Sequence, residues 1–467
     1  MSEFSATLDR IIAVQRAALA KDGIPSEDVR IDRLARVAKL ISENREEISD
    51  ALSRDFGYRA DTHTLIELSS TINAMTFSAK HVGEWMKPDH REALAADARA
   101  VVEYTPKGVI GIMGPWNVPF YLIMIPLAGV LAAGNRAVIK PSEFTPIAAE
   151  LMQRLVAQYF SEDEVTVVLG GATEGAEFAS AAFDHIMFTG STNVGRHVMR
   201  AASANLVPVT LELGGKCPTI VTESFNIDRA AERIMAVKAY NSGQICVAPD
   251  HVYVPESRKQ EFINACLTAT KTMYPEGIGS PDYTSMINSH HYQRMADMVQ
   301  DARDKGATVI DAIASEGKRH ERQFPLTLVL DPGDDAQVMN EEIFGPILPI
   351  FGYTAIDDVL TAIATRDHPL GLFIFSDHDS EIRYILDHSV SGGVTVNDVM
   401  AHIYPDDLPF GGIGPSGMGR YHSKYGFEEF SNVRSVYYQT ESEEQIAAVR
   451  APYSSEVRQF WLTPFDA

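Results

Sequence analysis

VIGIMGPWNVPFYLIMIPLAGVLAAGNRAVIKPSE (residues 109–143) contains a short apolar run near each end, with a helix-length apolar segment between the two runs. The part from 109 to 135 carries no charge, and its length alone would suit a membrane span. Turn-forming residues interrupt it at four places: Pro115, Asn117, Pro119 and Pro126. The stretch therefore predicts a strand, a turn, a buried helix and a second strand, which is a repeating unit of parallel sheets.

The same alternation continues along the chain. Five apolar runs are separated by helix-length segments: VIGIM (109–113), AVIK (137–140), VTVVLG (165–170), HIMFTG (185–190) and PVTLELG (208–214). This spacing predicts a doubly wound parallel sheet. A second series of strand candidates predicts a second α/β domain over about 214–400: PTIVTE, HVYVP, ATVID, PLTLVLD, GLFIFS and GGVTVND.

Three segments lie outside these two series. Residues 1 to about 90 carry three helical patterns, including VRIDRLARVAKLISENREEISDALSRDF (29–56), and form a helical lead-in. RAVVEYTPKG (99–108) and RSVYYQT (434–440) alternate like strands but have no local sheet to join. Such strands either pair across a subunit interface or form an edge hairpin.

The composition excludes several classes of protein. A length of 467 residues allows two hydrophobic cores, and the net charge of −23 would repel nucleic acid and anionic membranes. The three cysteines, Cys217, Cys246 and Cys266, form no CxxC metal pattern and are too few for a disulfide scaffold. The N-terminus is an amphipathic pattern without the features of a signal peptide. We expect a cytoplasmic protein with no metal, nucleic-acid or membrane partner.

Ligands of doubly wound sheets bind beyond the carboxyl ends of the strands. Gly190 in FTGSTNVG ends one run and opens a helix whose first N–H groups could face a phosphate, although Gly-Ser-Thr is also an ordinary helix cap. Lys140 and Glu143 follow another run, where the carboxylate could accept two ribose hydroxyls, or simply lie in a solvated turn. The only literal dinucleotide fingerprint is Gly412, Gly414 and Gly417. It follows no apolar strand and better fits a closing loop.

Three further side chains could carry chemistry, and each has an ordinary structural alternative. Cys246 in NSGQICVAP is a possible nucleophile or an inert core thiol. Glu212, between two leucines in TLELGGK, would have a raised pKa suited to a general base, or would be a buried structural carboxylate. Asn117 in PWNVPF could donate to an oxyanion or form a turn.

Taken together, seven strings in order resemble the NAD(P)-dependent aldehyde dehydrogenase superfamily: GPWNVPF, AVIKPSE, FTGSTNVG, LELGGK, NSGQICVAP, EEIFGP and LPFGGIGPSGMG. NSGQICVAPDHVYV and GRYHSKYGFEEFS are similar to its class 3 branch, and HIYPDDLPFGGIGPSGMGRYH is similar to bacterial coniferyl aldehyde dehydrogenases. Ser423 departs from the branch, where glycine is expected in the YHGK motif. This departure puts only local loop geometry in doubt.

The resemblance implies roles for the site residues. It makes Cys246 the nucleophile, Glu212 the general base, and Asn117 an oxyanion donor together with the Cys246 backbone N–H. The residues that it places at the cofactor are Trp116, Lys140, Ser142, Glu143, Gly190, Ser191, Gly195, Glu342 and Phe344. Glu143 should repel a 2′-phosphate and so favours NAD, but members of the branch use both cofactors, and NADP stays an alternative.

The resemblance also implies an α/β architecture with a Rossmann-type cofactor domain, an α/β catalytic domain and a small β oligomerisation element. The segments 1–98 and 109–213 would form the NAD(P)-binding domain, and 214–400 the catalytic domain. Residues 401–430 would form a closing loop, 99–108 and 431–445 the oligomerisation strands, and 446–467 a C-terminal tail. The expected assembly is a homodimer.

One helical face would line the aldehyde tunnel: Val118, Tyr121, Leu122 and Ile125. Tyr121 suits a flat aromatic substrate such as coniferaldehyde, although core packing explains these residues as well. The alternatives are a medium-chain aliphatic aldehyde dehydrogenase, a hydrolase that uses Cys246 and Glu212, and a non-catalytic binding or structural protein on this fold.

Overall fold

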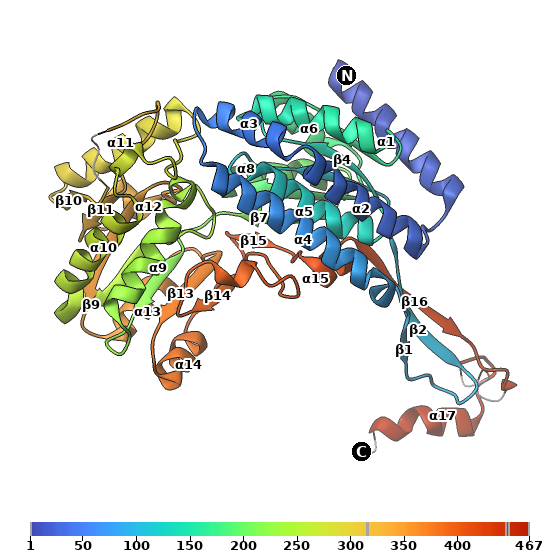
Figure 1. Ribbon diagram of the computed structural model, residues 1–467. Coiled ribbons are helices and arrows are strands. Elements are labelled where there is room, and N and C mark those ends of the chain that lie inside the picture. The colour runs from blue at the N-terminus through green and yellow to red at the C-terminus, as the bar shows by residue number, and fades with distance from the viewer. Residues whose placement is uncertain (1, 314–316, 444–445, 447–448, 466–467) are drawn as a thin grey trace.

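Three sheets organise the chain in the computed structural model, which describes residues 2–313, 317–443, 446 and 449–465 (Figure 1). The first sheet has six strands in the order β15-β7-β6-β3-β4-β5 and is parallel except for β15. Its strands are β3 (Val109–Met113), β4 (Arg136–Lys140), β5 (Val165–Val167), β6 (His185–Gly190), β7 (Val209–Leu213) and β15 (Gly417–Met418). The predicted doubly wound sheet is confirmed.

A second sheet of seven strands lies beside the first one and has the order β10-β11-β12-β9-β8-β13-β14. Only β10 is antiparallel to its neighbour. Its strands are β8 (Pro218–Val221), β9 (His251–Pro255), β10 (Thr308–Asp311), β11 (Thr327–Leu330), β12 (Ile347–Tyr353), β13 (Gly371–Phe375) and β14 (Gly393–Val396). The sequence analysis missed the interior strand β12. Pro349 and Gly352 weaken its strand pattern, and burial between β11 and β9 overrides that weakness.

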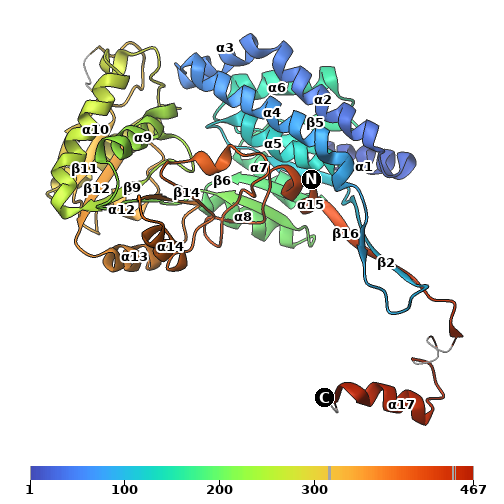
Figure 2. The same cartoon turned by 60° about the horizontal axis from the view of Figure 1, so that its bottom comes forward.

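The third sheet is small and antiparallel, and consists of β1 (Asp89–Arg91), β2 (Arg99–Pro106) and β16 (Ser431–Tyr438). The two unplaced runs of the sequence pair with each other along eight residues, from Pro106 opposite Ser431 to Arg99 opposite Tyr438. Figures 1 and 2 show this small sheet extending away from the body of the molecule, with the C-terminal helix α17 beyond it.

Helices pack against the first two sheets. The N-terminal helices are α1 (Glu3–Asp22), α2 (Glu27–Glu43), α3 (Arg45–Phe56) and α4 (Asp61–Trp85). Those of the first sheet are α5 (Pro119–Ala132), α6 (Pro146–Tyr159), α7 (Ala172–Ser180) and α8 (Thr192–Ser203). The remaining ones are α9 (Ile227–Ala239), α10 (Lys259–Met273), α11 (Ser289–Asp304), α12 (Gln337–Asn340), α13 (Ile356–Ala364), α14 (Asp379–Asp387), α15 (Ser423–Glu429) and α17 (Ser455–Leu462).

The lead-in contains four helices, where the sequence pattern predicted three. The long pattern over 29–56 divides at Asn44, whose backbone leaves helical geometry at φ −117° and ψ 18°. The Asn44 side chain donates to the carbonyl of Leu40 at 2.7 Å. An asparagine that bonds to nearby backbone competes with helix continuation, although the apolar spacing runs through it.

The uncharged stretch after β3 forms α5, which is buried on every side in the main hydrophobic core. Among the described helices, none is long and apolar enough to cross a membrane. The start of α5 is fixed by Glu67 of α4, whose Oε1 accepts the N–H groups of Phe120 at 2.7 Å and Tyr121 at 3.1 Å. Its Oε2 lies 2.7 Å from Arg59 Nη1, and both side chains are fully buried. The Glu67 carboxylate therefore fixes the position of α5 and of the residues that precede it.

Replacing Glu67 with glutamine leaves the Arg59 charge buried and unpaired. Removal of one partner from a buried ion pair costs about 3–5 kcal/mol of folding free energy. We expect the urea midpoint of Glu67→Gln to fall accordingly in a fluorescence-monitored titration. Glu84→Gln is the control, since Glu84 and its partner Lys87 are exposed. Equal midpoints for the two variants would show that the buried pair contributes nothing.

Candidate active site

Two cavities meet at one point between the first two sheets. A long cleft runs past the carboxyl ends of β3, β4, β6 and β7, and an apolar tunnel adjoins it. Three residues line both the tunnel and the cleft: Asn117, Leu122 and Cys246. A molecule in the tunnel and another in the cleft can therefore meet beside the Cys246 thiol.

The loop before Cys246 has an unusual backbone. Asn241, Ser242 and Gly243 all have positive φ values, of 51°, 53° and 68°. A side chain on Gly243 would approach the carbonyl oxygen of Gly345 to 2.5 Å, so only glycine fits there. Such a left-handed run in a buried segment stores strain, which the surrounding contacts must hold in place.

Gln244 provides much of that restraint. Its Nε2 donates to the carbonyls of Asn241 at 2.9 Å and Ser285 at 3.1 Å, and its Oε1 accepts from Ile287 N at 2.9 Å. Asn117 is tied to the same loop, because its Nδ2 donates to the Gln244 carbonyl at 3.0 Å. An amide nitrogen has a second hydrogen, so Asn117 can also donate into the space beside Cys246.

Glu212 lies at the end of β7 with an exposed fraction of 2%. Within the described part of the chain, its Oε1 has no hydrogen-bond partner. Burial raises the pKa of Glu212 well above its usual range. Burial also raises the pKa of the Cys246 thiol, and the nearby carboxyls of Glu212 and Glu342 raise it further. A carboxyl of this kind can act as a proton acceptor near neutral pH.

The loop before β12 places Glu342 and Phe344 in the cleft. Burial raises the pKa of Glu342 to about 7. Its Oε2 would lie 2.0 Å from a side chain at position 214, so the first glycine of LELGGK makes room for it. Phe344 has a φ of 47°, and its ring lies edge-on to Trp116 at 5.4 Å.

The rest of the long cleft is lined by most of the residues that were predicted to hold the cofactor. Lys140 Nζ lies 3.7 Å from Glu143 Oε2 at the end of β4, and Ser142 lies between them in the lining. Ser191 caps α8 by accepting from Val194 N at 3.4 Å, so the helix start faces the cleft beside Gly190. Gly195 faces away from this opening. A side chain there would meet Leu213 Cδ2 at 2.6 Å, so glycine lets α8 pack closely on β7.

The tunnel contains three of the four predicted residues, namely Val118, Tyr121 and Leu122. Ile125 is buried in the main core at 4% exposed and is not part of the described lining. Sequence reasoning missed lining residues from three distant segments: Ile66, Glu67, Ser70, Tyr240, Ile245, Val247, Met400, Ile403, Tyr404, Phe410 and His422. The last five of these lie in or beside the closing loop predicted over 401–430, which could have pointed to them.

A buried cysteine and a buried glutamate lie beside a long cleft at the carboxyl ends of parallel strands, where ligands of α/β enzymes bind. The chain belongs to the aldehyde dehydrogenase family, whose model matches residues 5–436. It is 43% identical to the coniferyl aldehyde dehydrogenase of Pseudomonas sp., over 97% of this chain and 95% of that protein. It is 37% identical to mouse aldehyde dehydrogenase family 3 member A2, over 93% and 89% respectively.

The structure of a substrate-bound Staphylococcus aureus AldH superposes with a TM-score of 0.92 at 34% identity, covering 98% of this chain and 99% of that one. The fold and the family resemblance predicted from sequence are thus confirmed. The chain is an enzyme of the aldehyde dehydrogenase family, and its general reaction is NAD(P)-dependent oxidation of an aldehyde.

The raised pKa of Glu212 predicts a pH-dependent cost to stability. The folded state favours the protonated carboxyl, so stability falls as pH rises from about 4.3 toward the raised pKa. Glu212→Gln removes this loss. We expect the apparent Tm of the variant to exceed that of the unchanged protein by about 2 °C or more at pH 8.5, and by less at pH 5.

Differential scanning fluorimetry at the two pH values measures this difference. Glu232→Gln, at an exposed position of α9, is the control and should leave the profile unchanged. A variant less stable than the unchanged protein at pH 8.5 would contradict the inferred cost of burying Glu212.

Proposed function

We propose that the protein oxidises an aromatic aldehyde to its carboxylic acid through a thioester on Cys246, with NAD as the preferred cofactor. The observation that carries this proposal is the position of Cys246 at the junction of the apolar tunnel and the long cleft. An aldehyde in the tunnel would have its carbonyl carbon at the thiol, with its hydrogen directed toward the cleft.

Each of the three central residues has a part in the reaction. Glu212 accepts the thiol proton, and Cys246 Sγ forms a bond to the aldehyde carbon. The oxygen that gains the negative charge accepts hydrogen bonds from Asn117 Nδ2 and from the Cys246 N–H. A bound nicotinamide supplies the acceptor for the hydride that leaves this carbon. Glu212 passes the thiol proton to solvent and, once ionised again, takes a proton from the water that attacks the thioester carbon. The carbon–sulfur bond then breaks, which releases the acid and restores the thiolate.

The preference for NAD rests on Glu143. Its carboxylate lies beside Lys140 at the mouth of the cleft, where ribose hydroxyls would find an acceptor. A 2′-phosphate in the same place would be repelled, and two like charges at about 4 Å interact by roughly 1–4 kcal/mol at partly exposed sites. Lys140 offsets part of this repulsion, so the preference is one of degree.

The aromatic substrate rests on the tunnel lining and on the relatives. Rings from Tyr121, Tyr240, Tyr404 and Phe410 surround the approach to Cys246, and flat apolar walls suit a planar conjugated aldehyde. The named activity of the Pseudomonas relative supports the same class of substrate. A medium-chain aliphatic aldehyde is the competing substrate, because the lining has few polar groups to reject it.

The test of the proposed function is cofactor reduction by the purified protein, with coniferaldehyde and with octanal, each supplied with NAD and with NADP. We expect the highest kcat/KM for coniferaldehyde with NAD, and no turnover by Cys246→Ala. Octanal as the better substrate would overturn the aromatic assignment, and NADP as the better cofactor would overturn the role of Glu143. Tyr121→Ala should lower kcat/KM for coniferaldehyde about tenfold relative to octanal, since it removes one aromatic wall.

We further propose that the small sheet joins two copies of the chain as a homodimer. β16 is an edge strand of that sheet, and its exposed side chains include Val433, Tyr437 and Tyr438, at 57%, 44% and 46%. An exposed apolar edge favours pairing with another chain. The small sheet extends from the body of the molecule, where a second copy can reach it (Figure 2).

Light scattering should therefore give a mass of about twice the 51.3 kDa of one chain. A lysine at Val433 or Tyr437 would place an unpaired charge in the interface, and we expect Val433→Lys and Tyr437→Lys to shift the protein toward monomers. Val390→Lys, at a similarly exposed residue away from the small sheet, serves as the control. Monomers of the unchanged protein, or dimers of the variants as tight as those of the control, would refute this interface.

A further inference from the structure

Asp250 follows Cys246 by four residues and lies outside both cavities, yet its buried carboxylate connects three parts of the site. It is 3% exposed and directly precedes β9. Its Oδ1 accepts from Lys216 Nζ at 2.5 Å, and its Oδ2 accepts from Ile343 N at 3.0 Å. Lys216 lies in the short loop between β7, which carries Glu212, and β8. Ile343 directly follows Glu342.

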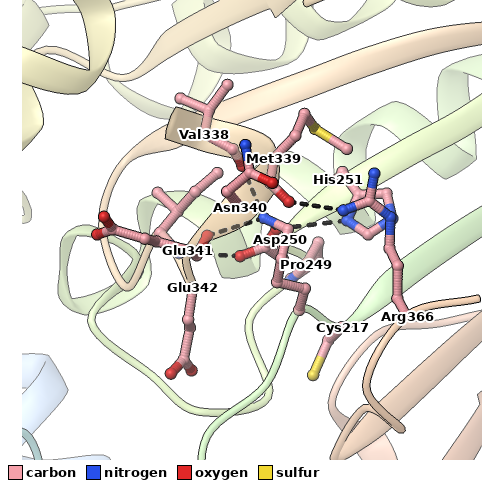
Figure 3. Close-up of polar contacts among 12 residues, drawn as sticks. Cys217, Pro249, Asp250, His251, Val338, Met339, Asn340, Glu341, Glu342 and Arg366 are labelled. Atoms are coloured by element: carbon pink, nitrogen blue, oxygen red, sulfur yellow. Dashed lines mark hydrogen bonds and ion pairs between the residues drawn. The ribbon is translucent and has the colours of Figure 1, made fainter. Parts of the chain in front are cut away.

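Lys216 extends the same connection. Its Nζ also donates to the carbonyls of Val338 at 2.6 Å and Glu341 at 2.9 Å. The residues on either side of Glu342 are therefore both tied to this ion pair, one through its carbonyl and the other through its N–H. Figure 3 shows the Glu342 side chain extending from this tethered loop in the direction away from Asp250.

The segment of Cys246 is held by the same group of residues. The Asp250 N–H donates to the Cys217 carbonyl at 2.8 Å, and Cys217 Sγ donates to the Cys246 carbonyl at 3.4 Å. Lys238 Nζ donates to the Pro249 carbonyl at 2.8 Å. The thiol-bearing loop and the Glu342 loop are thus fixed to each other through Asp250, and neither Asp250 nor Lys216 lines either cavity.

We propose that Asp250, with Lys216, is a positioning residue that sets the distance between the Cys246 thiol and the Glu342 loop on which the nicotinamide end of the cofactor rests. This inference rests on the role proposed above for Cys246 and on the family resemblance, which implies that Glu342 contacts the nicotinamide ribose. Hydride transfer requires the aldehyde carbon bonded to Cys246 and the nicotinamide to be aligned with each other. A misplacement of about 1 Å can lower the rate about a hundredfold. The thiol chemistry by itself needs only Cys246 and its immediate neighbours.

Asp250→Asn separates these two requirements. Both oxygens of the carboxylate accept hydrogen bonds, and an amide offers only one accepting oxygen, so the loop loses one of its ties. We expect kcat to fall about ten- to a hundredfold, with a larger deuterium isotope effect from the aldehyde hydrogen. The rate at which iodoacetamide alkylates Cys246, followed by mass spectrometry, should stay within about twofold, since Cys246 keeps its own surroundings.

Asp331→Asn is the matched control, because Asp331 pairs with Lys259 at the surface and touches neither loop. If the unchanged protein and this control turn over while Asp250→Asn matches them in kcat and isotope effect, the positioning role is wrong and the proposed function stands. A loss of alkylation in proportion to kcat would also overturn it, because that pattern marks general collapse of the site. No turnover by the unchanged protein would count against the proposed function instead.

Lys216→Arg covers the case in which Asp250→Asn does not fold. It keeps the charge pair and changes the geometry of the bonds to Val338 and Glu341, since a guanidinium is planar and longer. We expect a smaller fall in kcat, about three- to tenfold, with the same increase in isotope effect and unchanged alkylation. Unchanged kcat in this variant would overturn the positioning role.

Discussion

Exclusion of water from a carboxyl and a thiol is the constraint on which the site depends. Glu212 lies on β7 of the first sheet and Cys246 in the loop before β9 of the second, and their pKa values rise because the surrounding chain removes solvent from both. Burial of this kind costs stability, so it requires a rigid frame. The two sheets provide that frame, because the cleft is lined by residues at the carboxyl ends of the first sheet's strands and by loops that lead into β9 and β12 of the second sheet.

Much of the rigidity comes from polar side chains that take no part in the chemistry. Glu67 fixes the start of α5 through two backbone N–H groups, and α5 follows directly after Asn117. Gln244 holds the left-handed turn before Cys246. Asp250 joins the loops that carry Cys246 and Glu342. Each of these groups is buried and paired, which makes the backbone positions around the thiol hard to shift.

The tunnel is a different kind of feature, because it is assembled from segments far apart in the chain. Its walls combine the first turns of α5 with Tyr240 and with the closing loop around Tyr404 and Phe410. Helical spacing after Asn117 predicted Val118, Tyr121 and Leu122 for this wall. The same spacing also selected Ile125, which lies in the core, because periodicity gives a buried face without saying which part of it borders a cavity.

The sequence alone determined the alternation of strands and helices, the buried character of α5 and the candidate residues for the chemistry. These properties follow from local hydrophobic patterns and from short motifs around Cys246, Glu212 and Asn117. Tertiary structure decided the interior strand β12 with its proline, and the pairing of β2 with β16. It also decided the role of Asp250, since hydrogen bonds to Lys216 and to Ile343, ninety-three positions away, depend on chain segments that only folding brings together.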